Sequence, residues 1–306
     1  MEIVVFGAGS LGTLVGGLLA SEHEVTLVGR NPHVSAVREE NLRVADATGN
    51  EANQFDFEAH PEATTDGTGL SADLAVVTVK AFDTEESAED LATGRIDAAL
   101  SLQNGMGNEE VLADRLDCPV LAGTVTYGAV LREPGVVACT GEGEVVLGPR
   151  GGGTSATADR VGRAFDAAGL RTTVADDMPR RLWEKLAVNA GINATTALAR
   201  VENGAVLDGP AHEVATDAGR ETARVARTEG VELSDEAAVR AVERVAEATA
   251  ANTSSMQQDV LADRRTEVEA INGFVASRAR ESGVSVPVNR TMANLLRAWE
   301  ADRPQD

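Results

Sequence analysis

EIVVFGAGSLG at residues 2–12 places five strand-forming residues directly before a glycine-rich turn, and this stretch decides the fold. TLVGGLLAS at residues 13–21 is an apolar helical pattern, and EVTLVGR at residues 24–30 is a second strand pattern. A strand, a glycine turn, a helix and a second strand make a βαβ unit. These residues therefore predict a nucleotide-binding α/β fold.

The glycine turn has the spacing of a dinucleotide-binding motif. Gly7 permits a tight turn, Gly9 lets the backbone approach a pyrophosphate, and Gly12 lets the helix pack closely on the strand. The amino end of the helix then presents N–H groups and a positive dipole end to the anion. A turn whose glycines serve packing alone is the alternative. We predict cofactor contacts along the whole turn, at Gly7, Ala8, Gly9, Ser10, Leu11 and Gly12.

The end of the second strand pattern selects the dinucleotide. An acidic side chain there would accept hydrogen bonds from the ribose 2′-OH of NAD, but the sequence has Gly29 and Arg30. An arginine can pair with a 2′-phosphate, and the missing carboxylate removes a repulsion. The sequence therefore favours NADPH over NADH. A solvated Arg30 in an arginine-rich chain is the alternative.

The first half of the chain continues with strand patterns that polar or helical stretches separate. Apolar runs lie at residues 74–79, 98–102 and 120–125. This alternation predicts a parallel sheet with helices on its faces. Two short β-rich segments bounded by glycine, residues 136–138 and 144–147, are expected to form a hairpin that extends the sheet.

Long helical patterns rich in Ala, Arg and Glu replace the strand patterns in the second half of the chain. Ser254 or Ser255 is the expected N-cap of a helix over residues 256–281. We therefore predict an α/β fold in two parts. An N-terminal Rossmann-type dinucleotide-binding domain, residues 1–176, is followed by an all-α C-terminal domain, residues 177–306.

The charge of the chain restricts its partners. The formal net charge is −22, from 49 acidic and 27 basic residues. Nucleic acid and anionic membranes are therefore poor partners, and the self-repulsion, which salt screens, indicates salt adaptation. No apolar run approaches the ~18 residues that span a bilayer, no secretory signal pattern is present, and the histidines and cysteines lack metal-ligand spacing. We expect a cytoplasmic protein with no metal site.

Lysine is nearly absent from the chain. Only Lys80 and Lys185 are lysines, and the other 25 of the 27 basic residues are arginines. In WEKLAVNAGIN, Lys185, Asn189 and Asn193 recur every four residues, so they share one helix face. Burying such groups costs free energy unless they have partners, which favours a polar wall for a substrate. A solvated face or helix-packing amides are the alternatives.

Four segments of the sequence resemble the ketopantoate reductase (2-dehydropantoate 2-reductase) family. They are GAGSLG, TVKAFDT, LQNGMGNEE, and the pair WEKLAVNAGINATTAL with NTSSMQQDVLADRRTEVEAINGF. The resemblance covers nearly the whole chain. It implies a Rossmann domain and a helical domain with the active site in the cleft between them.

The resemblance also implies roles for individual residues. Lys185 would be the general acid, and Ser255 would contact the substrate carboxylate. The substrate-binding residues would be Asn104, Lys185, Asn189, Asn193, Asn203, Asn252 and Ser255. Besides the glycine turn and Arg30, the cofactor-binding residues would be Lys80, Asn104, Gly128 and Glu267. A helix cap at Ser255 and a surface salt bridge between Glu267 and Arg264 are the alternatives.

The expected reaction is hydride transfer from NADPH to the C2 keto carbon of 2-oxopantoate, with Lys185 protonating the oxygen. The product would be pantoate, a precursor of coenzyme A. A D-2-hydroxy acid dehydrogenase on the same scaffold, acting on another branched or aromatic 2-oxo acid, is one alternative. A non-catalytic dinucleotide-sensing protein is another. Ala-rich helical patterns such as residues 237–250 would allow a homo-oligomer.

Overall fold

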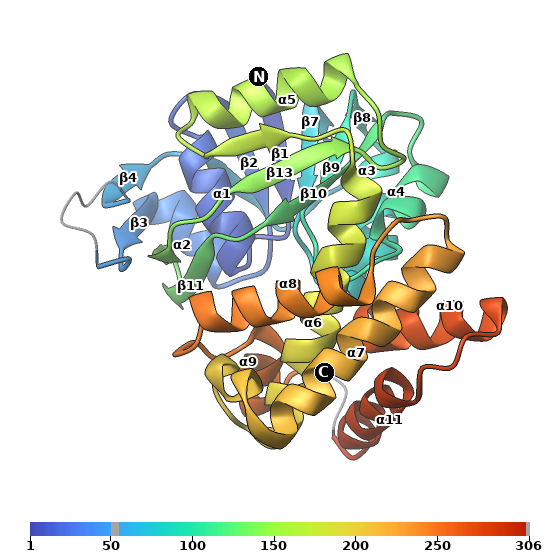
Figure 1. Ribbon diagram of the computed structural model, residues 1–306. Coiled ribbons are helices and arrows are strands. Elements are labelled where there is room, and N and C mark those ends of the chain that lie inside the picture. Colours follow the sequence, from blue (N-terminus) through green and yellow to red (C-terminus); the bar gives the residue numbers. More distant parts are fainter. Residues whose placement is uncertain (50–54, 304–306) are drawn as a thin grey trace. The chain divides into compact units, whose positions relative to one another are not determined.

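The computed structural model describes residues 1–49 and 55–303, and Figure 1 labels its helices and strands. The chain divides into two compact units. Unit 1 comprises Met1–Gln103 and Asn108–Met178, and unit 2 comprises Asn104–Gly107 and Pro179–Asp306. Four residues from the first half of the chain thus belong to unit 2, which no sequence pattern indicated. The division into two functional domains at residue 176 stays a prediction.

Unit 1 is built on an eight-stranded sheet with the strand order β14-β13-β10-β9-β7-β1-β2-β5. Neighbouring strands are parallel, except for the antiparallel pair of β10 and β13. The strands are β1 (Glu2–Phe6), β2 (Glu24–Val28), β5 (Glu62–Thr64), β7 (Leu74–Val77), β9 (Ala99–Ser101), β10 (Val120–Val125), β13 (Val145–Pro149) and β14 (Thr172–Val174). The predicted βαβ unit and the predicted parallel sheet are confirmed.

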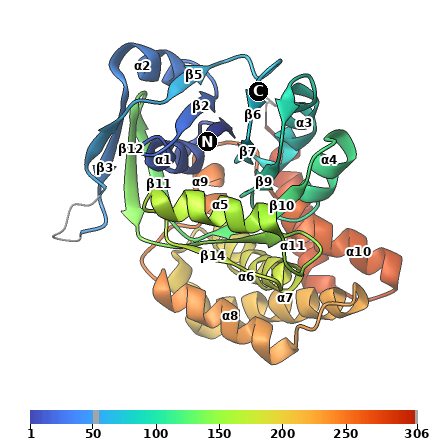
Figure 2. The same cartoon turned by 90° about the horizontal axis from the view of Figure 1, so that it is seen from above.

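Both faces of this sheet are buried, because side chains alternate between them along each strand. Val5 packs with one hydrophobic cluster and Val4 with another. The first cluster includes residues of α1 (Ser10–Leu19) and α5 (Ala156–Ala167). The second includes residues of α3 (Thr84–Ala92) and α4 (Asn108–Arg115), which lie together on one side of the sheet in Figure 2. Helices therefore cover both faces, as the sequence predicted.

The predicted hairpin of residues 136–138 and 144–147 is wrong. β12 pairs with β11 and β3 in a separate four-stranded sheet, whereas β13 joins the main sheet. The turn at Gly135, whose φ is 80°, joins β11 to β12, so the hairpin partner of β12 precedes it in the chain. The remaining elements of unit 1 are α2 (His33–Glu40), β3 (Leu42–Asp46), β4 (Phe57–Ala59), β6 (Ser71–Ala72), η1 (Ala81–Asp83), β8 (Arg95–Ile96), β11 (Gly128–Glu133) and β12 (Val136–Gly141).

Unit 2 is helical in all its regular elements. They are α6 (Met178–Ala199), η2 (Asn203–Leu207), α7 (Gly209–Thr228), α8 (Asp235–Ala248), α9 (Ser255–Leu261), the π-helix η3 (Glu269–Gly273), α10 (Phe274–Ser282) and α11 (Pro287–Ala301). Its core is rich in alanine, which lets helix axes approach closely. Within the described residues, no helix is both long enough and apolar enough to cross a membrane.

The predicted single helix over residues 256–281 is also wrong, because the chain leaves the helical conformation after α9. Asp263 has a φ of 52°, and the Arg264 N–H donates to the carbonyl of Asp259 at 2.8 Å. Farther on, the hydroxyl of Thr266 donates to the Glu300 carboxylate at 2.6 Å. These contacts hold residues 262–268 outside any helix, and the chain then enters η3.

The acidic surface predicts a stability that depends on salt. The net charge of −22 repels itself in dilute buffer, and salt screens that repulsion over distances of about 10 Å at 0.1 M and about 3 Å at 1 M. We expect the melting temperature to rise by more than about 5 °C between 0.1 and 2 M KCl, which corresponds to roughly 2 kcal/mol. Scanning calorimetry across the KCl series measures this. A flat series would contradict salt adaptation.

Candidate functional site

The three glycines of the predicted motif differ in what surrounds them. A Cβ on Gly7, whose φ is 113°, would lie 2.5 Å from the Val79 nitrogen, and one on Gly12 would lie 2.1 Å from the Gly7 carbonyl oxygen. A Cβ on Gly9 would meet no other described residue within 4 Å, its chain neighbours aside. The fold itself therefore requires two of the glycines. The third leaves open space at the start of α1, where the motif places a pyrophosphate.

The start of α1 suits an anion. Gly9 is the N-cap and brings no side chain, and the first turn contains no acidic residue. Ser10 accepts the Leu131 N–H at 3.0 Å through its hydroxyl oxygen, which ties the turn to β11. A helix start with a positive dipole end and no competing carboxylate favours a bound phosphate.

Arg30 and Lys80 follow strands β2 and β7 of the same parallel sheet. The Arg30 guanidinium lies 3.3 Å from the Asp83 carboxylate, and the Asp83 N–H donates to the Lys80 carbonyl at 2.8 Å. The structure thus brings the Arg30 loop and the Lys80 turn together through Asp83, a residue that the sequence reasoning missed. The Arg30 side chain is 86% exposed, so this ion pair is weak.

His33 fixes the helix that follows Arg30. It is buried, its Nδ1 accepts the Gly135 N–H at 3.0 Å, and its Nε2 lies 3.1 Å from the Thr13 hydroxyl. Burial lowers the pKa of His33, which agrees with a neutral ring that accepts a hydrogen bond. The beginning of α2 is therefore tied to α1 and to the turn before β12. This anchors the loop that carries Arg30.

Gly128 is the first residue of β11. A Cβ on it would lie 2.7 Å from the Thr140 hydroxyl oxygen and 3.0 Å from the Gly141 nitrogen. The neighbouring Tyr127 hydroxyl accepts the Arg171 N–H at 3.0 Å. Strand pairing with β12 therefore accounts for this glycine by itself. Its predicted contact with a cofactor stays a prediction.

The polar stripe of unit 2 consists of Lys185, Asn189 and Asn193 on α6. The first two side chains are half-buried, the Lys185 Nζ atom is shielded from solvent, and Asn193 is 8% exposed. The same helix contributes six residues to the apolar core of the unit: Trp183, Leu186, Ala187, Ala190, Ala194 and Ala197. This burial argues against a solvated face, while helix-packing amides stay the alternative, and the substrate-binding role of the stripe stays a prediction.

A pair of buried hydroxyl groups joins the stripe helix to α9. The Thr196 and Ser254 hydroxyl oxygens lie 2.7 Å apart, and Ser254 also accepts the Gln257 N–H at 3.2 Å. Ser254 is therefore the N-cap of α9, and Ser255 is an exposed residue in its first turn. The alternative role of Ser255, the N-cap of the helix, therefore falls to Ser254. Sequence alone left the choice open because both residues are serine.

Asn203 and Asn252 lie close together. The Asn203 N–H donates to the Asn252 carbonyl at 3.0 Å, and the Asn203 side chain donates to the Thr249 hydroxyl at 3.0 Å. Asn203 is buried, while Asn252 is exposed. Hydrogen bonds therefore join η2, the end of α8 and the segment before α9 to one another.

Glu267 is a buried carboxylate with a predicted site residue beside it. It is 6% exposed, and the Asn104 side chain donates to its Oε2 at 3.5 Å. Arg264 pairs instead with Asp259, at 3.1 Å. The burial of Glu267 and this other pairing of Arg264 argue against the surface salt bridge that was the alternative.

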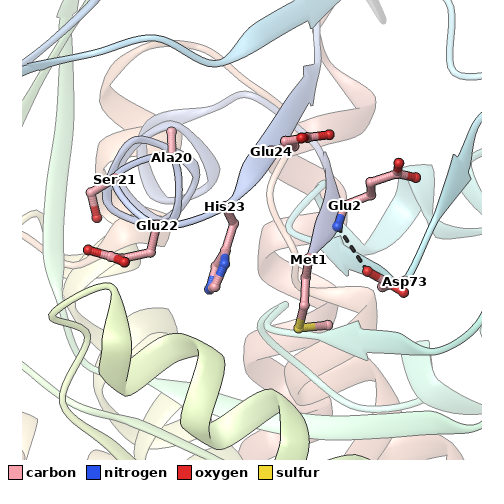
Figure 3. A pocket seen from close by; sticks show the side chains of 8 residues that line it. All are labelled: Met1, Glu2, Ala20, Ser21, Glu22, His23, Glu24 and Asp73. Atoms are coloured by element: carbon pink, nitrogen blue, oxygen red, sulfur yellow. Dashed lines mark hydrogen bonds between the residues drawn. The ribbon is translucent and has the colours of Figure 1, made fainter.

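The open hollow shown in Figure 3 lies at the opposite end of the main sheet from the glycine turn. Its lining includes Glu2, Glu22, Glu24 and Asp73, at the beginnings of β1 and β2 and beside β7. The Glu2 N–H donates to the Asp73 carboxylate at 2.9 Å. So many carboxylates repel an anionic cofactor, and α/β sheets bind ligands at their carboxyl ends. We place no role in the reaction there.

Unit 1, with a glycine turn at the carboxyl end of a parallel strand, and unit 2, with its polar stripe, define a dinucleotide-dependent oxidoreductase. A family model described as ketopantoate reductase PanE/ApbA matches residues 3–152, and one described as its C terminal part matches residues 177–300. The chain belongs to the ketopantoate reductase family. The resemblance drawn from the four sequence segments is thereby confirmed.

Relatives match over the whole chain. A 2-dehydropantoate 2-reductase of Halobacterium salinarum is 46% identical over 310 residues, which cover 99% of this chain and 100% of the relative. A 2-dehydropantoate 2-reductase of Archaeoglobus fulgidus is 40% identical over 302 residues, which cover 98% of each chain.

Two solved structures share the fold. The crystal structure of a PanE/ApbA family ketopantoate reductase from Ralstonia eutropha JMP134 matches with a TM-score of 0.88 and 32% identity, covering 99% of each chain. The ternary structure of D-mandelate dehydrogenase with NADH and anilino(oxo)acetate matches with a TM-score of 0.89 and 25% identity, covering 99% of each chain. The fold therefore does not by itself select a substrate.

Proposed function

We propose that the chain catalyses the NADPH-dependent reduction of 2-dehydropantoate (ketopantoate) to pantoate, a step toward pantothenate and coenzyme A. The observation that carries the proposal is the polar stripe of α6, in a chain related over its whole length to 2-dehydropantoate 2-reductases. A non-catalytic dinucleotide sensor would need no half-buried lysine and amides beside an apolar core. A cytoplasmic location and a homo-oligomeric state belong to the same proposal.

The residues of each unit suit one part of the reaction. The open space at Gly9 and the start of α1 suit the dinucleotide, which, when bound, supplies the hydride for the C2 keto carbon. Lys185 donates a proton to the keto oxygen as negative charge develops on it. Asn189, Asn193, Asn203 and the exposed Asn252 and Ser255 hold the 2-oxo acid in attack geometry.

Arg30 supports NADPH as the preferred cofactor. Its side chain is exposed and pairs only weakly with Asp83, so the 2′-phosphate can displace that carboxylate. A bidentate guanidinium–phosphate contact is stronger than this surface ion pair. The NADH in the D-mandelate dehydrogenase structure belongs to that protein.

We predict that Arg30→Asp loses its preference for NADPH. The new carboxylate repels the 2′-phosphate, and it can accept hydrogen bonds from the 2′-OH of NADH. The KM for NADPH should rise by about tenfold or more, equal to at least about 1.4 kcal/mol, while activity with NADH is kept or improved. Equal losses with both cofactors would mean that Arg30 does not read the phosphate. Asp83→Asn is a matched control, because removing the competing carboxylate should leave NADPH use intact.

The substrate is tested with a panel of 2-oxo acids. A D-2-hydroxy acid dehydrogenase is the competing function, because the D-mandelate dehydrogenase fold matches closely. NADPH oxidation in molar KCl should be fastest by kcat/KM with 2-dehydropantoate. A higher kcat/KM with an aromatic 2-oxo acid would replace the proposed function with that of a D-2-hydroxy acid dehydrogenase.

A further inference from the structure

The turn Asn104–Gly107 is anchored to the π-helix η3 inside unit 2. The Met106 N–H donates to the Ala270 carbonyl at 3.0 Å, and the Asn104 side chain donates to Glu267 at 3.5 Å. Met106 also packs against the apolar core of the unit. The residues on either side of the turn belong to unit 1. A four-residue excursion of the chain therefore carries Asn104 to Glu267.

Gly105 makes this close approach possible. Its φ is 82°, and a Cβ on it would lie 2.5 Å from the Ala270 Cβ, 2.6 Å from the Ala270 carbonyl oxygen and 2.9 Å from its carbonyl carbon. Two of these atoms are backbone, so the neighbour cannot move aside without moving η3. Gly107 has a similar φ of 96°, but a Cβ on it would meet only the Phe274 ring, at 3.7 Å. Both glycines thus have a positive φ, which favours glycine, but only at Gly105 would a Cβ also clash with a neighbouring residue.

The π-helix also holds the helix that carries the polar stripe. The Asn272 side chain is fully buried, and its Nδ2 donates to the Ala190 carbonyl of α6 at 3.1 Å and to the Asn289 side chain at 3.0 Å. Ala190 directly follows Asn189 in the stripe. The Gly273 N–H donates to the Val268 carbonyl, five residues back, at 2.8 Å, which is the bond of a π turn. Such turns are frequent at functional sites.

We infer that η3 is the positioning element of the reaction, and that Gly105 and Ala270 are positioning residues that set Asn104 beside Glu267. One end of η3 fixes the turn through Ala270, and the other fixes α6 through Asn272. Asn104, Glu267 and the polar stripe are thereby held to one five-residue element. The inference rests on the proposed function, since it concerns the geometry of that reaction.

The test compares Gly105→Ala with Gly107→Ala, because both place a Cβ at positive φ and only the first strikes Ala270. We expect Gly105→Ala to lower kcat by about 10- to 100-fold, as small misplacements of a reacting group do, with a smaller change in KM. Gly107→Ala should keep kcat within about threefold of the parent, because its Cβ makes only ordinary contacts. Hydrogen exchange should be fast at the Met106 amide in the first variant and slow in the second.

A second variant approaches the same contact from the other side. Ala270→Val enlarges the side chain whose Cβ lies nearest to the Gly105 position, so it should lower kcat and speed exchange at Met106, as Gly105→Ala does. This keeps the inference testable if Gly105→Ala fails to fold. Melting temperatures of all the variants separate loss of the turn contact from loss of the fold.

Several outcomes would overturn the inference. One is a parental kcat in Gly105→Ala despite fast exchange at Met106, and another is slow exchange there, which would mean that the contact survives. Equal loss of kcat in Gly107→Ala would assign the effect to backbone strain alone. If the parent chain reduces no 2-oxo acid, the proposed function fails, and the positioning role fails with it. Exchange at the Met106 amide would still report whether its hydrogen bond to the Ala270 carbonyl is formed.

Discussion

Lys185→Arg should lower kcat by about 10² to 10⁴ while NADPH binding stays nearly normal. Arginine keeps the positive charge and much of the length, but its pKa lies far above neutral pH, so it cannot release a proton near neutrality. Lys185 is half-buried and its Nζ is shielded from solvent. We therefore expect the proton to come from the lysine itself. The measurements are kcat with 2-dehydropantoate and the Kd of NADPH from fluorescence titration.

Glu184→Gln is the matched control for Lys185→Arg. Glu184 is on the same helix and pairs with Arg244 at 2.8 Å near the surface, so losing its charge should cost less than about 1 kcal/mol and leave kcat unchanged. An isotope effect with NADPH deuterated at the transferred hydrogen shows that hydride transfer limits the rate. A near-parental kcat in Lys185→Arg under that condition would leave Lys185 as a binding residue only.

Gly9→Ala should raise the Kd of NADPH by at least about 30-fold, equal to roughly 2 kcal/mol, without unfolding the protein. The φ of Gly9 is −83° and its ψ is −165°, which alanine adopts without strain. Apart from its chain neighbours, no described residue would lie within 4 Å of the new Cβ. Among the described residues nothing stands in the way of the methyl group, so we expect it to obstruct a ligand whose pyrophosphate approaches the backbone there. Isothermal titration and thermal unfolding measure the two quantities separately.

Gly12→Ala distinguishes a ligand effect from a packing effect. Its Cβ would lie 2.1 Å from the Gly7 carbonyl oxygen and 2.4 Å from the Thr78 hydroxyl, so this variant should lose thermal stability as well as affinity. If Gly9→Ala binds NADPH as tightly as the parent, the pyrophosphate does not approach Gly9, and the glycine turn serves packing alone.

The parallel sheet was predictable because its signals are local. Strands β1 and β2 with the glycine turn between them lie within about thirty consecutive residues, and alternation of strands with helices reports a parallel sheet. The four-stranded sheet was missed because the partners of β12 include β3, which lies more than ninety residues earlier in the chain. No local pattern reports such a pairing.

The break after α9 was missed for a similar reason. Residues 256–281 have a helical pattern throughout, but tertiary contacts outweigh this local preference. One of them is the hydrogen bond from the Thr266 hydroxyl to the Glu300 carboxylate, 34 residues away. In the site, residue types and helix spacing indicated the polar stripe. The contacts of Arg30 with Asp83 and of Asn104 with Glu267 join residues 53 and 163 positions apart, so only the fold reveals them.

Because Asn104–Gly107 belongs to unit 2, we expect neither half of the chain to be complete when the two halves are expressed as separate fragments. A fragment that begins at residue 177 would contain η3 but not the Met106 amide that bonds Ala270, nor the side chain that packs in its core. The complementary fragment would contain residues 104–107 but would lack Ala270 and the core of unit 2, which they contact. Two halves expressed apart should therefore each be incomplete, and mixing them should restore slow exchange at Met106 by fragment complementation.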